Sequence, residues 1–333
     1  MRALPRVLVD WPREQLGIVP TPFTLAPALG VAIGAPALWF KREELLGFGF
    51  GGNKVRTLSL ILADVRRAGG DVLVTGAGAH SNWVRAAAAA TAAAQLPLEA
   101  VFWGDPPPQA GGNYLLTRLL GARCRFTGDA DRASVDRGIA ARAAELRGEG
   151  REPYTVALGG ACALGVLAHA LAAAELAEQS RAAGVAPAVV AMAVGSGTTL
   201  AGWLLGRKLL AAPWRIEGFT VSRPAAEIVP RVAQLFGEAA ALLGAAVFLD
   251  RNEVIVHDGF VGPGYGVPSL EGNAAIRLAA HQEGIFLDPT YTAKAFAGLC
   301  HHLHTGQIPD DRPLVFVHTG GEPALFIHPE IAP

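Results

Sequence analysis

The chain has 333 residues with 28 basic and 29 acidic side chains, a net charge of −1, so composition favours neither nucleic acid nor an anionic membrane as partner. Its three cysteines, Cys124, Cys162 and Cys300, lie far apart and match neither a zinc pattern nor a disulfide framework. With no secretory signal and no apolar run that we expect to span a bilayer, these features favour a cytoplasmic protein.

Short apolar strands alternate with Ala/Leu-rich helices along the chain. The expected elements are a helix at 55–68, a strand at 71–76, a helix at 81–94, a strand at 98–103, a helix at 113–120, a strand at 123–127, a helix at 133–148, a strand at 154–158, a helix at 163–183, a strand at 188–194, a helix at 199–210 and strands at 215–221 and 314–317. Such alternation is typical of parallel sheets covered on both faces. The sequence predicts two α/β lobes: a large domain, 1–53 and 164–333, and a small domain, 54–163.

The first chemical signal is a glycine-rich loop that ends in a lysine. Four glycines stand between positions 47 and 52, and Asn53 and Lys54 follow directly. Glycines let the backbone adopt positive φ and pass close to a flat ligand. A lysine whose pKa is lowered in such a cleft can form a Schiff base with an aldehyde. Taken alone, the segment also fits a turn followed by a solvated lysine on a helix.

A second segment has the composition of an anion site. Gly195, Ser196, Gly197, Thr198 and Thr199 follow a strand and open a helix. The amides of such a turn converge, the helix dipole favours negative charge, and the hydroxyls add donors. The segment lacks the patterns of nucleoside triphosphate and dinucleotide loops. It predicts a phosphate cradle, with a turn that holds no ligand as the alternative.

Two further segments supply polar groups at strand ends. Ser81 is a natural N-cap whose neighbouring free amides would hold a carboxylate, unless it is only a cap, and Asn82 offers a neutral donor. Thr319 follows the strand at 314–317, at the edge where α/β sheets bind ligands. A reactive lysine, a phosphate cradle, a carboxylate cradle and a strand-end hydroxyl together match the needs of pyridoxal 5′-phosphate.

With these motifs the chain resembles the tryptophan-synthase-β-like (fold type II) pyridoxal-phosphate enzymes, and within them the D-cysteine desulfhydrase and 1-aminocyclopropane-1-carboxylate deaminase family. The resemblance covers nearly the whole chain. It is carried by Lys-Arg-Glu-Glu-Leu (41–45), Gly-Gly-Asn-Lys-Val-Arg (51–56), Ser-Asn (81–82), Gly-Gly-x-x-Ala-Leu-Gly (159–165), Gly-Ser-Gly-Thr-Thr-x-Ala-Gly (195–202), Gly-Tyr-Gly (264–266), Asp-Pro-Thr-Tyr-Thr-x-Lys (288–294) and His-Thr-Gly-Gly (318–321). It implies two three-layer α/β/α lobes with mostly parallel sheets, the cofactor in the cleft between them, and a homodimer.

The resemblance also implies roles for individual residues. Lys54 would hold the cofactor and remove the α-proton, with Tyr265 or Tyr291 assisting, and Ser81 would receive the substrate carboxylate together with the amides that follow it. The cofactor-binding residues would be Asn53, Lys54, Asn82, Thr292, Thr319 and the turn Gly195–Thr199. His80, Trp83 and Glu322 depart from the family pattern and are expected beside the substrate, unless the His80 and Glu322 side chains turn away.

Two positions favour the desulfhydrase branch of this family over the deaminase branch. The deaminases place glutamate and leucine where this chain has Thr292 and Thr319. A carboxylate near the pyridine nitrogen would keep it protonated and strengthen the electron sink, whereas a hydroxyl leaves the sink weaker. Elimination of a good leaving group tolerates the weaker sink better than opening of a cyclopropane ring does.

The sequence therefore predicts a pyridoxal-phosphate lyase that acts on a small β-substituted amino acid, either D-cysteine-like or a sulfonate-bearing alanine. The products would be a 2-oxo acid and ammonia. Two alternatives stay open. One is a 1-aminocyclopropane-1-carboxylate deaminase, and the other is a lyase-like protein that binds cofactor or amino acid without turnover. No metal site is expected.

Overall fold

The computed structural model describes residues 1–309 and 311–332, and its strands form two separate sheets. The larger sheet has six strands in the order β1-β2-β10-β7-β8-β9. Their bounds are β1 (Phe23–Leu25), β2 (Leu38–Arg42), β7 (Val189–Val194), β8 (Arg215–Thr220), β9 (Ile255–His257) and β10 (Leu314–His318). Neighbouring strands are parallel except β1, which is antiparallel to β2.

The smaller sheet is parallel throughout and has the order β5-β4-β3-β6. Its strands are β3 (Val72–Ala77), β4 (Leu98–Phe102), β5 (Arg123–Phe126) and β6 (Pro153–Thr155). Every residue of β3 and β4 is buried, which is expected of central parallel strands with helices on both faces.

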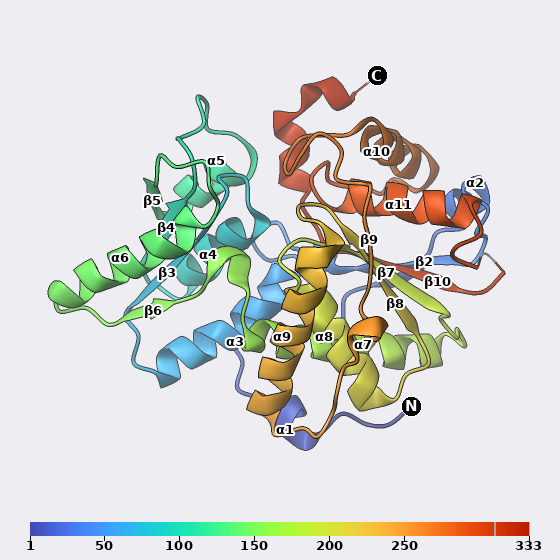
Figure 1. Ribbon diagram of the computed structural model, residues 1–333, viewed down its shortest axis with the longest axis horizontal. Coiled ribbons are helices and arrows are strands. Elements are labelled where there is room, and N and C mark those ends of the chain that lie inside the picture. Colours follow the sequence, from blue (N-terminus) through green and yellow to red (C-terminus); the bar gives the residue numbers. More distant parts are fainter. Residues whose placement is uncertain (310, 333) are drawn as a thin grey trace.

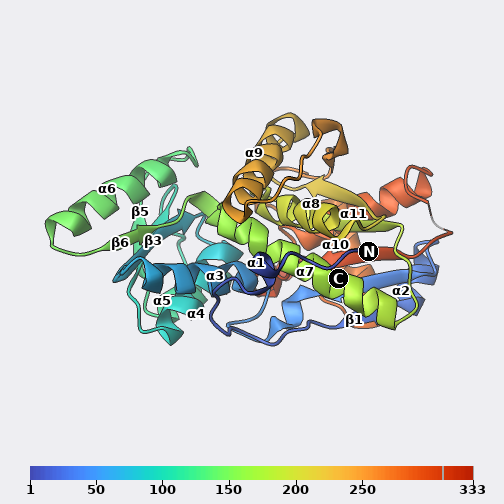
Figure 2. The same cartoon turned by 90° about the horizontal axis from the view of Figure 1, so that it is seen from below.

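Helices cover both faces of each sheet, so each lobe has three layers (Figures 1 and 2). In the large lobe α10 and α11 lie on one face and α7, α8 and α9 on the other, while in the small lobe α6 lies opposite α4. The helices are α1 (Arg6–Val9), α2 (Pro27–Ala32), α3 (Lys54–Arg67), α4 (Asn82–Ala93), α5 (Gly112–Leu119), α6 (Ser134–Gly148), α7 (Ala163–Ala182), α8 (Thr198–Leu210), α9 (Ala225–Leu243), α10 (Leu270–Glu283) and α11 (Thr292–His304), and the 3₁₀ turns are η1 (Glu43–Leu46), η2 (Leu158–Gly160), η3 (Arg251–Glu253), η4 (Glu322–Ile327) and η5 (Pro329–Ile331). The predicted two-lobed α/β/α architecture is confirmed.

One strand is shorter than the sequence predicts. The strand expected at 154–158 ends at Thr155, and the 3₁₀ turn η2 follows. Leu158, expected in the strand, instead begins this turn, whose Gly159 and Gly160 have positive φ angles of 69° and 75°. A Cβ on Gly160 would lie 2.4 Å from the Trp83 ring, so the turn brings bare backbone against that indole.

The sequence was expected to contain no apolar run that could span a bilayer, and helix α7 corrects this expectation. By length and composition, the span Leu158–Ala182 is a helix that could cross a membrane, although 67% of its most apolar stretch is buried inside the protein. Helix α7 packs against α3, α8 and α9. Its apolar residues therefore form part of the core of the protein.

A buried ion network fixes the start of α3. The Arg56 guanidinium donates to Glu43 Oε2 at 2.6 Å and to Glu175 Oε1 at 2.9 Å, and Lys41 also pairs with Glu175. Burial opposes ionisation of Glu43, but the Arg56 ion pair outweighs it and holds the pKa of that carboxyl below its usual value. Because removal of one partner would strand a buried charge, the network holds the first turn of α3, and with it Lys54, against the large sheet.

Candidate active site

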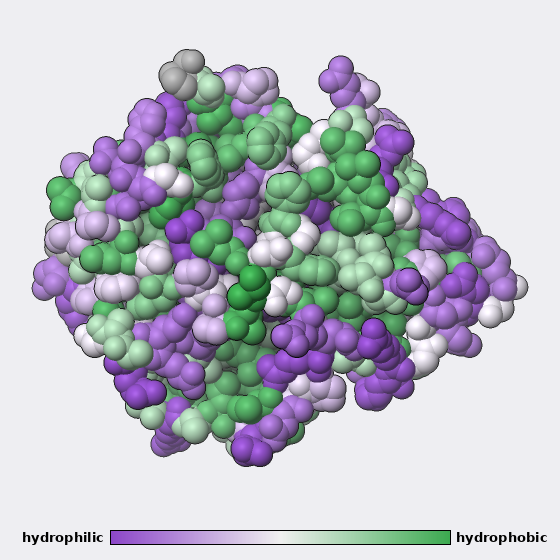
Figure 3. Space-filling model, turned by 180° about the vertical axis from the view of Figure 1, so that it is seen from behind, coloured by the Kyte–Doolittle hydropathy of each residue, from purple (hydrophilic) through white to green (hydrophobic). Residues whose placement is uncertain are grey.

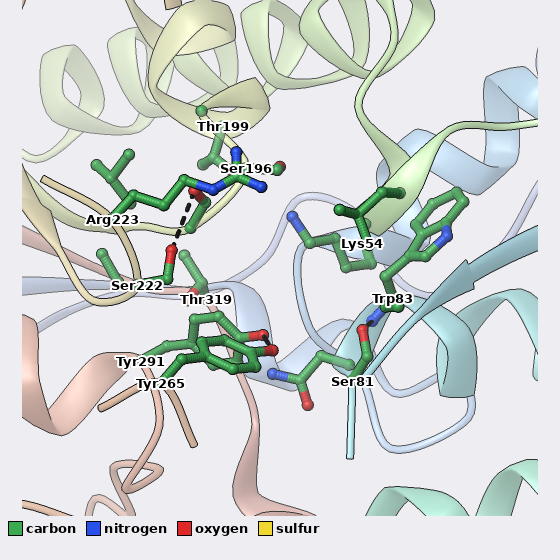
Figure 4. A pocket seen from close by; sticks show the side chains of 18 of the residues that line it. Lys54, Ser81, Trp83, Ser196, Thr199, Ser222, Arg223, Tyr265, Tyr291 and Thr319 are labelled. Atoms are coloured by element: carbon green, nitrogen blue, oxygen red, sulfur yellow. Dashed lines mark hydrogen bonds between the residues drawn. The ribbon is translucent and has the colours of Figure 1, made fainter. Parts of the chain in front are cut away.

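A pocket lies where residues of both lobes meet, which is a common place for small-molecule sites. Figure 4 shows labelled side chains from the two lobes facing one another across it. The expected site residues in its lining are Asn53, Lys54, Ser81, Asn82, Trp83, Gly195, Ser196, Gly197, Thr199, Tyr265, Tyr291 and Thr319. Segments far apart in the sequence are thus brought together.

Lys54 is the first residue of α3, and its side chain extends into this pocket (Figure 4). Burial lowers the pKa of its amine to about 8, against a smaller opposing influence from Cys162. Among residues 1–309 and 311–332 the amine has no hydrogen-bond or ion-pair partner. A substantial fraction of the amine is therefore neutral near physiological pH, which is the form that attacks an aldehyde.

The loop before Lys54 is shaped by close backbone contacts. Gly51 has a φ of 62°, and a Cβ there would lie 1.9 Å from the carbonyl oxygen of Glu44. The buried Arg85 donates to the carbonyl oxygens of Gly49 and Gly51. The glycines therefore serve the tight path of the loop as well as the approach of a ligand.

Asn53 joins this loop to two other parts of the site. Its backbone amide donates to the Thr319 carbonyl oxygen at 3.0 Å, directly after β10. Its side-chain Nδ2 donates to Thr199 Oγ1 at 2.9 Å. The lysine loop, the strand-end threonine and the turn before α8 are therefore held at fixed positions relative to one another.

The turn Gly195–Thr199 has the geometry of an anion cradle. It connects β7 to α8, and Gly197 is the N-cap of α8 with a φ of 91°. A Cβ at Gly197 would meet Val232 Cγ2 at 3.1 Å. The hydroxyls of Ser196 and Thr198 share a hydrogen bond of 3.1 Å. The amides at this helix N-terminus have no intrahelical acceptor and are free to donate to a phosphate.

The start of α4 forms the opposite wall. Ser81 caps this helix by accepting the Trp83 amide at 3.1 Å, and the Trp83 indole donates to Thr75 Oγ1 at 2.8 Å. Asn82 Oδ1 accepts a hydrogen bond of 2.8 Å from Asn113 Nδ2. Because Asn113 occupies the oxygen, the Asn82 amide nitrogen is the group left to face a ligand.

Tyr265 and Tyr291 come from different segments and their hydroxyls are hydrogen-bonded to each other (Figure 4). Burial raises the pKa of both phenols, so both keep their protons at neutral pH. The buried Asp288 accepts the Tyr291 amide at 3.0 Å and the Thr292 amide at 2.7 Å. This carboxylate fixes the backbone that presents Tyr291 to the pocket.

The remaining expected site residues lie outside the lining. The Thr292 hydroxyl donates to Asp288 Oδ1 and accepts the Asp288 amide, so both of its bonding roles are filled there. Thr198 bonds Ser196 within the turn. Glu322 accepts the Gly321 amide at 2.8 Å, and burial raises its pKa. Burial also lowers the pKa of His80.

Several lining residues carry no motif and were missed from the sequence. They are Trp103, Arg132, Ser222, Arg223 and Arg231. Trp103, Ser222 and Arg223 follow strands, Arg132 precedes α6 and Arg231 lies within α9, and none of these positions gives a local signal in the sequence. The charge of the pocket could therefore not be predicted, although its backbone cradles were.

The pocket fits pyridoxal 5′-phosphate by the chemistry of its groups. An unpaired amine of lowered pKa suits the aldehyde, and amides in a turn that a Cβ at Gly197 would crowd suit the phosphate. The free nitrogen of Asn82 suits the phenolic oxygen, and Thr319 offers a neutral hydroxyl for the ring nitrogen. The cofactor that the sequence predicts is thus compatible with every wall of the pocket.

Comparison with known proteins agrees with this reading. The family described as pyridoxal-phosphate dependent enzyme matches residues 14–320. A D-cysteine desulfhydrase from Serratia proteamaculans is 36% identical, over 98% of this chain and 99% of that protein. The D-cysteine desulfhydrase of Klebsiella pneumoniae strain MGH 78578 is also 36% identical, over 97% and 98% of the two chains.

Solved structures give the same result for the fold. An ACC deaminase homologue superposes with a TM-score of 0.90 at 34% identity, covering 98% of this chain and 96% of that one. A tomato (Solanum lycopersicum) threonine deaminase isoform 2 has a TM-score of 0.69 at 17% identity over 98% of this chain and 91% of that one, which shows a shared fold. The fold type II architecture is thereby confirmed. The chain belongs to the pyridoxal-phosphate-dependent enzymes, in the family of the D-cysteine desulfhydrases, and pyridoxal 5′-phosphate is its cofactor.

Proposed function

We propose that the protein is a lyase that eliminates the β substituent of a small amino acid and releases a 2-oxo acid and ammonia. The observation that carries this proposal is the absence of any carboxylate from the pocket lining among residues 1–309 and 311–332. A neutral Thr319 hydroxyl leaves the cofactor ring a moderate electron sink, which suits elimination. The similarity to D-cysteine desulfhydrases over nearly full length supports the same chemistry.

Bound pyridoxal phosphate would supply the electron sink that acidifies the substrate's α-hydrogen. The Ser81 hydroxyl and the first amides of α4 would orient the substrate carboxylate, since these donors lie at a helix N-terminus. The Lys54 amine would hold the cofactor and then accept the α-proton. The Tyr265–Tyr291 hydroxyl pair, protonated at neutral pH, would donate a hydrogen bond to the departing β substituent.

The pKa of Lys54 gives a prediction about cofactor uptake. Protein stripped of cofactor should take up pyridoxal phosphate at a rate that falls about tenfold for each pH unit below about 8, because only the neutral amine attacks the aldehyde. Above that pH the rate should level off. Stopped-flow absorbance of the yellow holoenzyme measures this. A rate independent of pH on the acid side of the amine's pKa would contradict the assigned state of Lys54.

A substrate panel tests the reaction class. We expect pyruvate and ammonia from β-substituted alanines, including D-cysteine and β-chloroalanine, and far less 2-oxobutyrate from 1-aminocyclopropane-1-carboxylate. The panel should contain both enantiomers of each amino acid, and coupled assays measure the 2-oxo acid and the ammonia that are released. 2-Oxobutyrate release without pyruvate release would favour the ring-opening alternative. Cofactor binding with no product from any amino acid would favour the binding protein without turnover.

The proposal extends to assembly and location. We propose a large domain, 1–53 and 164–333, a small domain, 54–163, and a cytoplasmic homodimer. The free cysteines support a reducing compartment. Hydrophobic areas on the face opposite that of Figure 1 (Figure 3) and exposed apolar side chains such as Phe248, Leu270 and Phe326 support burial of surface against a second copy. Sedimentation of the holoenzyme tests the dimer.

A further inference from the structure

The pocket carries an excess of positive charge. Besides Lys54, its lining includes the guanidinium groups of Arg132, Arg223 and Arg231. No ion pair joins any of these three arginines to a carboxylate within the two described ranges, 1–309 and 311–332. Like charges gathered in a partly enclosed cleft repel one another and raise the local potential. This potential favours the binding of anions in the pocket.

Two of the arginines lie on the phosphate side. Arg231 Nε donates to the Ser196 carbonyl oxygen at 2.9 Å, and Ser222 Oγ donates to the Gly195 carbonyl oxygen at 3.5 Å, which brings the neighbouring Arg223 beside the same turn. Figure 4 shows Arg223 on this side of the pocket with Ser196 and Thr199. Burial, Arg231 and Arg132 together lower the pKa of Arg223. A cofactor phosphate, which carries about two negative charges, would offset these two groups.

Arg132 lies elsewhere. It precedes α6 in the small lobe, and its Cζ is 5.9 Å from the Trp103 ring centroid and 5.7 Å from that of Tyr265, a residue of the large lobe. The Trp103 ring lies against the strand-to-helix loop that ends in Ser81, since a Cβ on Gly78 would be 2.6 Å from it. Arg132 therefore lines the pocket beside Tyr265, at the point where Trp103 of the small lobe meets the tyrosine pair of the large lobe.

We propose that Arg132 is the receptor for a tetrahedral oxyanion on the substrate's β-carbon, so that the substrate is an alanine with a β-sulfonate or β-phosphate group. This inference rests on the proposed elimination and names its substrate class. A guanidinium offers paired N–H donors that match such an oxyanion, and it packs against two aromatic rings whose centroids are 5.8 Å apart, which leaves its other side open to a ligand. A thiol substituent would leave this charge without a counterpart.

The chemistry balances without an oxidant or reductant. Lys54 takes the α-proton, the bond from Cβ to sulfur or to the ester oxygen breaks, and its electron pair leaves with sulfite or phosphate. One water molecule then converts the remaining three-carbon unit to pyruvate and ammonium. The negative charge of the leaving group grows as its bond to Cβ breaks, so Arg132 would bind it more strongly in the transition state than in the bound substrate. Loss of Arg132 should therefore lower kcat as well as raise KM.

The test compares Arg132→Met with Arg132→Lys and with Arg147→Met, a control at an exposed position on α6. Substrates are 3-sulfoalanine, O-phosphoserine and the neutral β-chloroalanine. In Arg132→Met the ratio of kcat/KM for the better oxyanion substrate to that for β-chloroalanine should fall about 100-fold, as expected for loss of a charge-assisted bidentate contact. Arg132→Lys should recover part of the ratio, and Arg147→Met should leave it unchanged.

A second measurement does not depend on turnover. Calorimetric titration of the holoenzyme with 3-sulfopropanoate, which carries both anions but no amine, should show about 100-fold weaker binding to Arg132→Met. An unchanged substrate ratio together with unchanged 3-sulfopropanoate binding would overturn the role of Arg132. If the proposed elimination activity itself were wrong, the result would be different, because the parent protein would then release no pyruvate even from β-chloroalanine.

Discussion

Lys54→Ala should abolish turnover, with kcat falling on the order of 10⁴-fold or more, because the same amine holds the cofactor and accepts the α-proton. The variant should also lose covalent attachment. Borohydride treatment followed by peptide mass analysis should find the cofactor on the Lys54 peptide of the parent protein and on no peptide of the variant. The turn at Gly195–Thr199 would still offer its amides, so loose cofactor binding should persist.

Lys208→Ala is the matched control. Lys208 lies on α8, outside the pocket lining, and pairs with Glu253 of η3. Its replacement should therefore leave both turnover and cofactor attachment intact. If Lys54→Ala kept the parent kcat, or if borohydride attached the cofactor to another lysine, the catalytic assignment would be wrong.

Gly197→Val should weaken cofactor binding by roughly 3 kcal/mol, as two charge-assisted hydrogen bonds of the turn are distorted. The physical reason is twofold: a valine disfavours the φ of 91°, and its Cβ would press on Val232 at 3.1 Å. Equilibrium dialysis with pyridoxal phosphate gives the dissociation constant, which should rise at least about 100-fold.

The strain of a positive φ needs its own control. Gly184 follows α7, has a φ of 67° and would find no atom within 4 Å of an added Cβ. Gly184→Val therefore carries similar backbone strain far from the cradle and should lower thermal stability without changing cofactor affinity. Equal cofactor affinity in Gly197→Val and the parent protein would mean that this turn does not bind the phosphate.

The elements that the sequence predicted well are those whose signal is local. The strands β3, β7 and β10 each contain a run of at least three apolar residues, and a glycine or threonine directly follows each strand. The backbone cradles at Ser81 and Gly197 were visible for the same reason, since a cap or a turn is encoded within a few neighbouring residues.

Features that depend on distant contacts could not be predicted in this way. Thr292 lies next to Tyr291 in sequence, yet its hydroxyl turns into the Asp288 loop and away from the pocket lining. Arg132 lies far along the chain from Tyr265, and only the approach of the two lobes brings its guanidinium over that ring. Sequence spacing fixes which residues are neighbours on one element but not which loops meet across a cleft.

The two hydrogen bonds of Asn53 have a consequence for how the enzyme could evolve. They fasten the lysine, the phosphate turn and the strand-end threonine into one unit on the large sheet. Two groups that would bind the substrate, Ser81 and Arg132, belong to the small lobe, whereas the Tyr265–Tyr291 pair belongs to the large lobe. Neither Ser81 nor Arg132 takes part in the two hydrogen bonds of Asn53. Substitutions at Arg132 can therefore change the amino acid that is accepted while this unit stays intact.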